Sequence, residues 1–143
     1  MRFKSWLAVA ALVLGLAAVA APAHAQISNE LKVKINHPWV VVDKTMPPGT
    51  YSFRMSRGMQ QQEMSATNLK TREKAVFMVK QAPRATAPRH SEAVFDRIGN
   101  KEFLTHIYQG GSAIGVMIEP SKEEARLEKQ GQKAVEHTES GLQ

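Results

Sequence analysis

The stretch from Ser91 to Tyr108, SEAVFDRIGNKEFLTHIY, decides the fold class. Its two runs are rich in β-branched and aromatic residues, and they flank Gly99-Asn100, a two-residue turn signal of β-hairpins. A turn at that position places Arg97 opposite Glu102 and continues with an apolar pair in the same register. Because both cross-strand pairs are favourable, the stretch predicts an antiparallel hairpin.

Upstream segments carry the same period-two pattern. Leu31 to Ile35 alternates apolar and polar residues, which is typical of a half-buried strand. His37-Pro38 then interrupts the pattern, because proline cannot donate to a strand ladder. The run Trp39 to Val42 is apolar throughout, and we expect a strand buried on both faces, followed by a turn at Asp43-Lys44.

The segment Met46 to Met55, MPPGTYSFRM, predicts a corner followed by a strand. Pro47-Pro48-Gly49 suits a type II-like turn, since proline presets φ and glycine accepts positive φ. After the turn, alternate residues put one apolar set and one polar set on opposite faces of a strand. The apolar set is Tyr51, Phe53 and Met55.

The C-terminal part predicts further β-structure and one helix. KAVFMVK, from Lys74 to Lys80, and Ile114 to Ile118 are both typical of strands. Ser121 and Glu124 form a capping box at the start of a charged helix over 121–131. We expect residues 132–143 to form a flexible tail, because they contain few large apolar residues.

Together these segments predict a mainly β protein, a small antiparallel β-barrel or β-sandwich of about seven strands with a short C-terminal α-helix. The strands fall within residues 26–120, a length that suits a single domain.

Residues 1–25 are typical of a secretory signal peptide. Arg2 and Lys4 precede a short apolar run, and Ala23-His24-Ala25 is a small-residue cleavage site, so we expect cleavage between Ala25 and Gln26. The apolar run is too short and too rich in alanine for a stable membrane span. The pattern predicts a secreted or periplasmic protein.

Composition excludes several classes of site. The chain has no cysteine, which rules out disulfides, thiolate metal sites and a cysteine nucleophile. Without Arg2 and Lys4 it keeps 17 basic against 13 acidic residues, a net charge near +4. Such a modest excess favours loose contact with anionic surfaces, and without an aromatic-basic RNA-binding motif we expect no nucleic acid partner.

The order of these motifs resembles small exported bacterial β-domain proteins of uncharacterised function. The resemblance rests on the Pro-x-Gly-x-Tyr corner at Pro47, the Phe-x-Arg-x-Gly hairpin at Phe95 and the charged C-terminal helix. It covers nearly the whole mature chain and implies a β fold and export.

Methionine and histidine are the candidate metal ligands. Soft thioethers select Cu(I), and five methionines lie between Met46 and Met78. The candidate copper ligands are Met55, Met59, Met64 and His106. The histidines His37, His90, His106 and His137 are isolated in sequence, so no zinc motif of the His-Glu-x-x-His type is present. Filling of the core by methionines is the alternative.

No catalytic motif appears. GGSAIG, from Gly110 to Gly115, lacks the strand-to-helix context of a nucleophile elbow, and no phosphate-binding glycine loop is present. The basic loop QAPRATAPRH offers a surface for an anionic partner, with Arg84, Arg89 and His90 as its candidate residues. The sequence therefore predicts an exported, non-catalytic binding or envelope-associated accessory protein without a cofactor; the alternative is an extracytoplasmic copper-handling protein with Met and His ligands.

Overall fold

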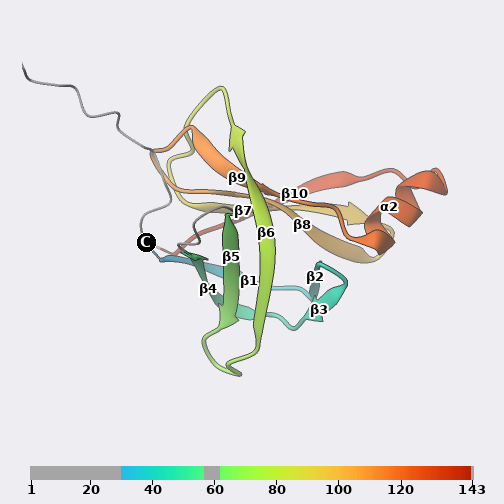
Figure 1. Cartoon of the computed structure of the whole chain (residues 1–143), viewed down its shortest axis with the longest axis horizontal. Helices are drawn as coiled ribbons and strands as arrows, with labels where there is room; N and C mark the ends of the chain where they lie inside the picture. The colour runs from blue at the N-terminus through green and yellow to red at the C-terminus, as the bar shows by residue number, and fades with distance from the viewer. Residues whose placement is uncertain (1–29, 57–61, 143) are drawn as a thin grey trace, which may run out of the picture.

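The structure, a computed structural model, describes residues 30–56 and 62–142 and is mainly β (Figure 1). The described residues form ten strands and one helix. The elements are β1 (Leu31–Ile35), β2 (Trp39–Val41), β3 (Lys44–Met46), β4 (Gly49–Ser56), β5 (Glu63–Asn68), β6 (Lys74–Pro83), β7 (Glu92–Ile98), β8 (Lys101–Tyr108), β9 (Ile114–Ile118), α2 (Lys122–Lys129) and β10 (Val135–Ser140). The predicted signal segment and the Ala25–Gln26 cleavage site lie outside the described residues, as does Met59.

The strands form one curved sheet in two parts, which share the long strand β6 (Figure 1). The first half of β6 pairs with β5, which continues to β4 and β1. Its second half pairs with β9, which continues to β8, β7 and β10. The two ends of this array meet where Val33 of β1 forms an isolated bridge with Gly141, just after β10. The sheet therefore curls around its core.

The short hairpin β2–β3 departs from the expected antiparallel arrangement. β2 pairs with β8 in parallel through Val40 and Phe103, so the sheet is mixed. The expected burial of Val42 and the turn at Asp43-Lys44 are wrong by one residue. Val42 and Asp43 both have positive φ, 46° and 60°, and Val42 is exposed. A two-residue hairpin turn of type I′ needs positive φ at both central residues, and this takes Val42 out of the strand.

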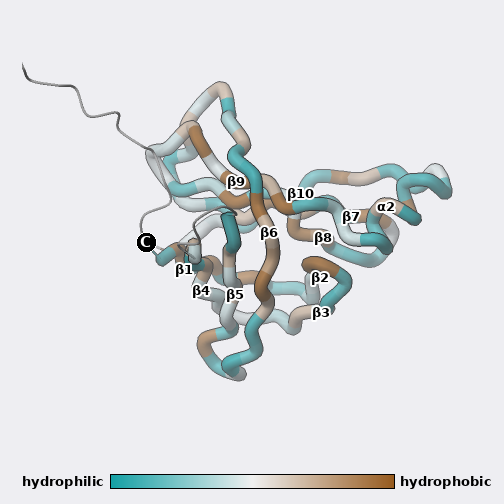
Figure 2. Tube along the Cα trace, viewed as in Figure 1, coloured by the Kyte–Doolittle hydropathy of each residue, from teal (hydrophilic) through white to brown (hydrophobic). Residues whose placement is uncertain are grey.

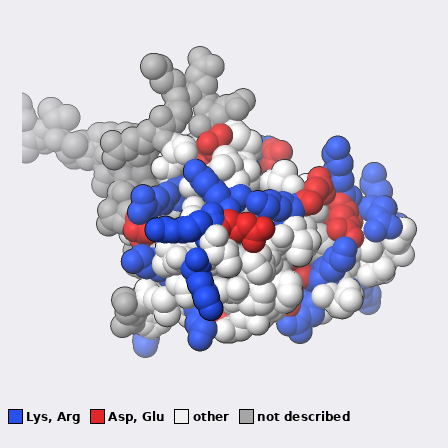
Figure 3. Space-filling view, turned by 90° about the horizontal axis from the view of Figure 1, so that it is seen from below, with Lys and Arg blue, Asp and Glu red and all other residues white. Residues whose placement is uncertain are grey.

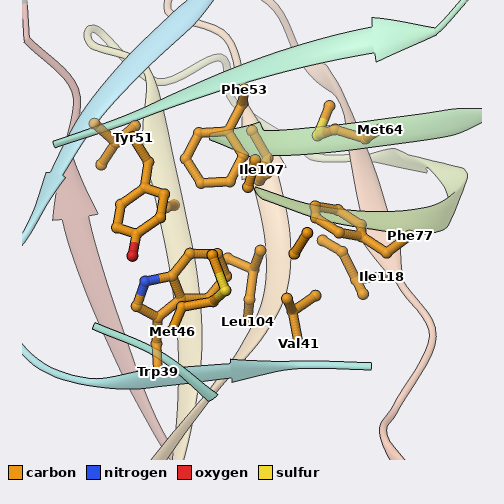
Figure 4. Close-up of a cluster of buried hydrophobic side chains, with 14 of the residues drawn as sticks. Trp39, Val41, Met46, Tyr51, Phe53, Met64, Phe77, Leu104, Ile107 and Ile118 are labelled. Carbon is orange, nitrogen blue, oxygen red and sulfur yellow. The ribbon is translucent and has the colours of Figure 1, made fainter. Parts of the chain in front are cut away.

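Alternation of apolar residues builds the core, as the sequence predicts. Leu31, Val33 and Ile35 are buried while Lys32 and Lys34 are exposed. Hydrophobic residues recur along the strands in Figure 2, whereas most turns are hydrophilic. Figure 4 shows the centre of the core, where side chains from both parts of the sheet interdigitate. Its largest fully buried members include Trp39, Met46, Tyr51, Phe53, Met64, Phe95 and Ile107.

The corner before β4 is locked by its own tyrosine. The Tyr51 hydroxyl donates a hydrogen bond to the Pro47 carbonyl four residues back. Gly49 passes so close to Asn68 that a Cβ on the glycine would lie 2.6 Å from the amide nitrogen of that side chain. The corner thus has a structural role, and it directs the Tyr51 side chain into the core.

The predicted hairpin register is confirmed in β7–β8. Arg97 pairs with Glu102 and Phe95 with Leu104 across the Gly99-Asn100 turn. A register shift follows, at which Thr105 is the extra residue and donates its hydroxyl hydrogen bond to the Val94 carbonyl.

The C-terminal segment is ordered further than its composition suggests. The capping box of Ser121 and Glu124 starts helix α2 as predicted, and Leu127 packs beside a small cluster of Val40, Ile98 and Phe103. The flexible tail expected at 132–143 is wrong for 135–140, which form β10 on the edge of β7. A strand held mainly by backbone pairing carries no apolar pattern for sequence reasoning to detect. No helix among the described residues is long and apolar enough to cross a membrane.

Candidate metal centre

Three side chains from distant parts of the chain meet beside the core: His37, Glu102 and His137. One ligand atom from each lies within 4.8 Å of the others. The His37 ring packs edge-on against the Phe95 ring at 5.0 Å, and its centroid lies 4.9 Å from that of His137. The geometry therefore brings two imidazoles and a carboxylate together, a donor set used by zinc sites.

The backbone explains why these residues converge. Pro38 ends the β1 ladder, so His37 sits where the chain leaves one part of the sheet for the other. Glu102 is the second residue of β8, on the core-facing side with Leu104. His137 of β10 lies opposite Phe95 of β7 and shares its inward face.

The His37 ring has a defined proton arrangement. His37 Nδ1 lies 3.1 Å from the Pro38 carbonyl oxygen, which can only accept, so Nδ1 is the protonated nitrogen. In the neutral ring Nε2 then carries the lone pair, and this atom is buried without a hydrogen-bond partner. A backbone carbonyl on the opposite ring nitrogen is the usual companion of a metal-binding histidine.

Glu139 of β10 lies beside the two histidines of the cluster. Its Oε1 lies 3.4 Å from His37 Nε2 and 3.7 Å from His137 Nε2, and none of the three side chains is more than 30% exposed. Donor atoms about 2.1 Å from a tetrahedral ion lie about 3.4 Å apart. Two nitrogen lone pairs facing one carboxylate oxygen repel unless a cation lies between them, and the cation is a proton or a metal ion.

Arg97 orients the buried carboxylate. Its guanidinium binds Glu102 Oε1 at 2.5 Å, and His137 Nδ1 lies 3.2 Å from the same oxygen. Glu102 Oε2 is left buried without a partner, on a side chain only 5% exposed. An unpaired buried carboxylate oxygen is costly, and a metal ion would satisfy it.

The copper ligands proposed from the sequence are placed differently. Met64 is fully buried, and Met55, its partner across β4–β5, packs against the same core. His106 lies on the outer face of β8, opposite the exposed Met117 of β9, and its ring stacks on Tyr108. Burial lowers the pKa of His106, against the effect of nearby Asp96 and Glu136. Met64 and His106 therefore face opposite sides of the sheet.

The basic loop is tied to its neighbours. Arg84 forms an ion pair with Glu92 at 2.7 Å and lies 5.1 Å above the Tyr108 ring. Gly111 donates a backbone hydrogen bond to the Pro88 carbonyl, which fixes the loop before Arg89 and His90. Lys and Arg side chains are spread over the face shown in Figure 3, with Asp and Glu between them. Arg84 thus has a structural role within the loop.

A second acidic group lies between α2 and β7. Carboxylate oxygens of Asp96, Glu124 and Glu128 lie within 4.8 Å of one another. Burial raises the pKa of Glu124 to about 7, although the Ser121 backbone N–H opposes the shift, and the negative charges of Asp96 and Glu128 add to it. Burial and the nearby Glu136 also raise the pKa of Asp96.

The raised pKa of Glu124 makes stability depend on pH. Because the folded protein holds this proton more tightly than the unfolded chain, the protonated Glu124 side chain contributes to the free energy of unfolding. This contribution is complete below pH 4.5 and is lost as pH rises through about 7. Glu124→Gln keeps an oxygen for the cap but cannot ionise. The free energy of unfolding of this variant should therefore rise relative to that of the wild type as pH increases from 4.5 to 7.5. The rise should reach up to about 3 kcal/mol, at about 1.4 kcal/mol per pKa unit.

Urea denaturation of both proteins across this pH range measures the difference. Subtraction of the two curves removes the contribution of the other carboxylates. A difference that stays constant over the whole range would show that Glu124 ionises in the folded state as it does in water.

Comparison of the chain with protein-family models, with curated proteins and with solved structures finds no match.

Sequence reasoning noted two of the four residues in the cluster, His37 and His137, only as isolated histidines, and it missed Glu102 and Glu139 as site residues. The sequence did contain one signal for the site: Glu102 lies two residues before Leu104 in a strand, and so shares its core-facing side. A carboxylate at such a position needs a partner of opposite charge.

Proposed function

We propose that this protein is an exported, non-catalytic binding protein that holds a divalent transition-metal ion, Zn²⁺ by its ligand set, between His37, Glu102 and His137. The observation that carries the proposal is the buried Nε2 of His37, which makes no hydrogen bond and faces the Glu139 carboxylate at 3.4 Å. Export is supported by the signal-peptide pattern of residues 1–25, which favours a secreted or periplasmic location.

The donor atoms favour zinc over Cu(I). Two imidazoles and a carboxylate are borderline-to-hard ligands, whereas Cu(I) prefers thioethers and thiolates. Copper bound by Met55, Met59, Met64 and His106, the alternative from the sequence, has less support because Met64 and His106 lie on opposite faces of the sheet.

The number of ligands favours binding over catalysis. The Glu139 carboxylate lies beside the Nε2 atoms of His37 and His137, and a small turn of the His137 ring would let it act as a fourth protein ligand. Zinc sites closed by four protein ligands are structural, whereas catalytic sites keep a position for water. Docking on an anionic surface or an envelope protein through Arg84, Arg89 and His90 has less support, since Arg84 is already paired with Glu92.

A zinc titration of the chain from Gln26, without a histidine tag, tests the proposal. Calorimetry should show one Zn²⁺ bound per chain in the wild type. His37→Ala and Glu102→Gln should each weaken zinc binding by about 10-fold to 100-fold. Effects of this size follow when the residues that support a metal ligand are changed.

His106→Gln is the matched control, because it removes one histidine outside the cluster. It should bind zinc as the wild type does. Absence of stoichiometric zinc binding in the wild type, or equal binding by His37→Ala, would overturn the proposal and leave the cluster as a network of side-chain contacts without a metal ion.

A further inference from the structure

The C-terminal strand β10 lacks the apolar anchor that the other long strands have. None of its six residues is buried, and its one aliphatic side chain, Val135, is 62% exposed. Backbone hydrogen bonds to β7 hold one edge. Beyond the strand, the chain is tied by backbone hydrogen bonds from Gly141 to Ser91 and from Leu142 to Lys32.

On the outer face of β10, an acidic residue lies opposite an acidic residue of β7. Glu136 lies opposite Asp96 of β7, and its charge raises the pKa of that carboxyl. Glu128 of α2 acts on Asp96 in the same direction. Carboxylates facing each other across two strands destabilise the pairing.

The inner face of β10 is therefore the one that can hold it by side chains. His137 and Glu139 share that face and contact His37, which precedes β2, and His137 contacts Glu102 of β8. Among the residues that the structure describes, His137 and Glu139 of the candidate metal centre thus supply the ion pairs of β10 toward the core.

We propose that the bound metal ion fastens β10 to the body of the protein, and that the C-terminal strand opens locally when the centre is empty. This inference rests on the proposed function. Opening moves His137 and Glu139 away from His37 and Glu102, so the ion must leave before β10 can detach. The same movement uncovers the edge of β7 and the Phe95 ring.

The coupling sets the size of the effect. A ligand that binds only the closed form reduces the population of the open form by a factor of one plus the ratio of free ligand to Kd. With free Zn²⁺ at about 100 times Kd, opening of β10 should become about 100-fold rarer.

Hydrogen–deuterium exchange of the chain from Gln26, with and without Zn²⁺, measures this opening. Without zinc, amides in 132–142 should exchange much faster than those of the β7–β8 hairpin. With zinc at about 100 times Kd they should slow by up to about 100-fold, while those of β5 change less. Glu102→Gln should reduce the slowing to about 10-fold or less. Glu136→Gln, which changes the outer face of the same strand, should retain the full slowing.

Two results would overturn the inference while the proposed function stands. One is zinc binding in the calorimeter with no slowing of exchange in β10. The other is a β10 that, without zinc, is already protected as strongly as the β7–β8 hairpin. If the wild type binds no zinc at all, both proposals fail, and the calorimetric titration identifies that case independently of the exchange data.

Discussion

Replacement of Trp39 with alanine is expected to lower the free energy of unfolding by about 3–5 kcal/mol, the usual cost of removing a large buried aromatic side chain. Trp39 is fully buried, and its ring packs against Tyr51 at 4.9 Å, Phe95 at 6.0 Å and Phe53 at 6.2 Å. Tyr51 and Phe53 belong to β4 and Phe95 to β7, so a cavity at Trp39 should loosen both parts of the sheet. Urea denaturation followed by circular dichroism measures the loss.

Trp39→Phe is the control for volume. The indole N–H points toward the Tyr51 hydroxyl in Figure 4, so phenylalanine removes this polar group and leaves a smaller cavity than alanine does. We expect this variant to lose less than half as much stability as Trp39→Ala. Equal losses would show that the indole nitrogen, and not packing, determines the contribution of Trp39. Since His37 lies two residues upstream, Trp39→Ala should also weaken zinc binding.

The parts of the fold that local chemistry determines could be predicted from the sequence. The turn at Gly99-Asn100 fixes the register of β7 and β8, and the alternation from Leu31 to Ile35 fixes which face of β1 is buried. β10 could not be predicted, because its pairing depends on the exposed edge of β7 and not on its own side chains. The parallel contact of β2 with β8 likewise depends on how distant segments pack.

The candidate metal centre lay further beyond sequence reasoning. His37 and Glu102 are 65 residues apart, and 35 more separate Glu102 from His137, so no motif spacing links them. They meet because the curled sheet brings the end of β1, the start of β8 and the middle of β10 to one place. The methionines attracted attention by their number, but Met46 and Met64 are core residues. The number of possible ligand residues in a sequence is weaker evidence for a metal site than the convergence of unpaired polar atoms in the structure.

Zinc at about 1,000 times its Kd is expected to raise the free energy of unfolding of the wild type by about 4.1 kcal/mol, because the ion binds the folded chain and its ligands separate on unfolding. Part of the gain comes from Glu102, whose Oε2 is buried and unpaired when no cation reaches it. Urea denaturation in buffers of fixed free Zn²⁺ concentration measures the gain as a shift of the midpoint at constant slope.

The dependence on zinc concentration separates a site of the folded state from general stabilisation. Once the site is saturated, each tenfold rise in free zinc should add about 1.4 kcal/mol in the wild type and in His106→Gln. His37→Ala and Glu102→Gln, which are expected to bind zinc 10-fold to 100-fold more weakly, should gain about 1.4 to 2.7 kcal/mol less than the wild type at the same concentrations. Equal gains in all four proteins would place the zinc elsewhere, and a loss of stability on adding zinc would mean that the ion prefers the histidines of the unfolded chain.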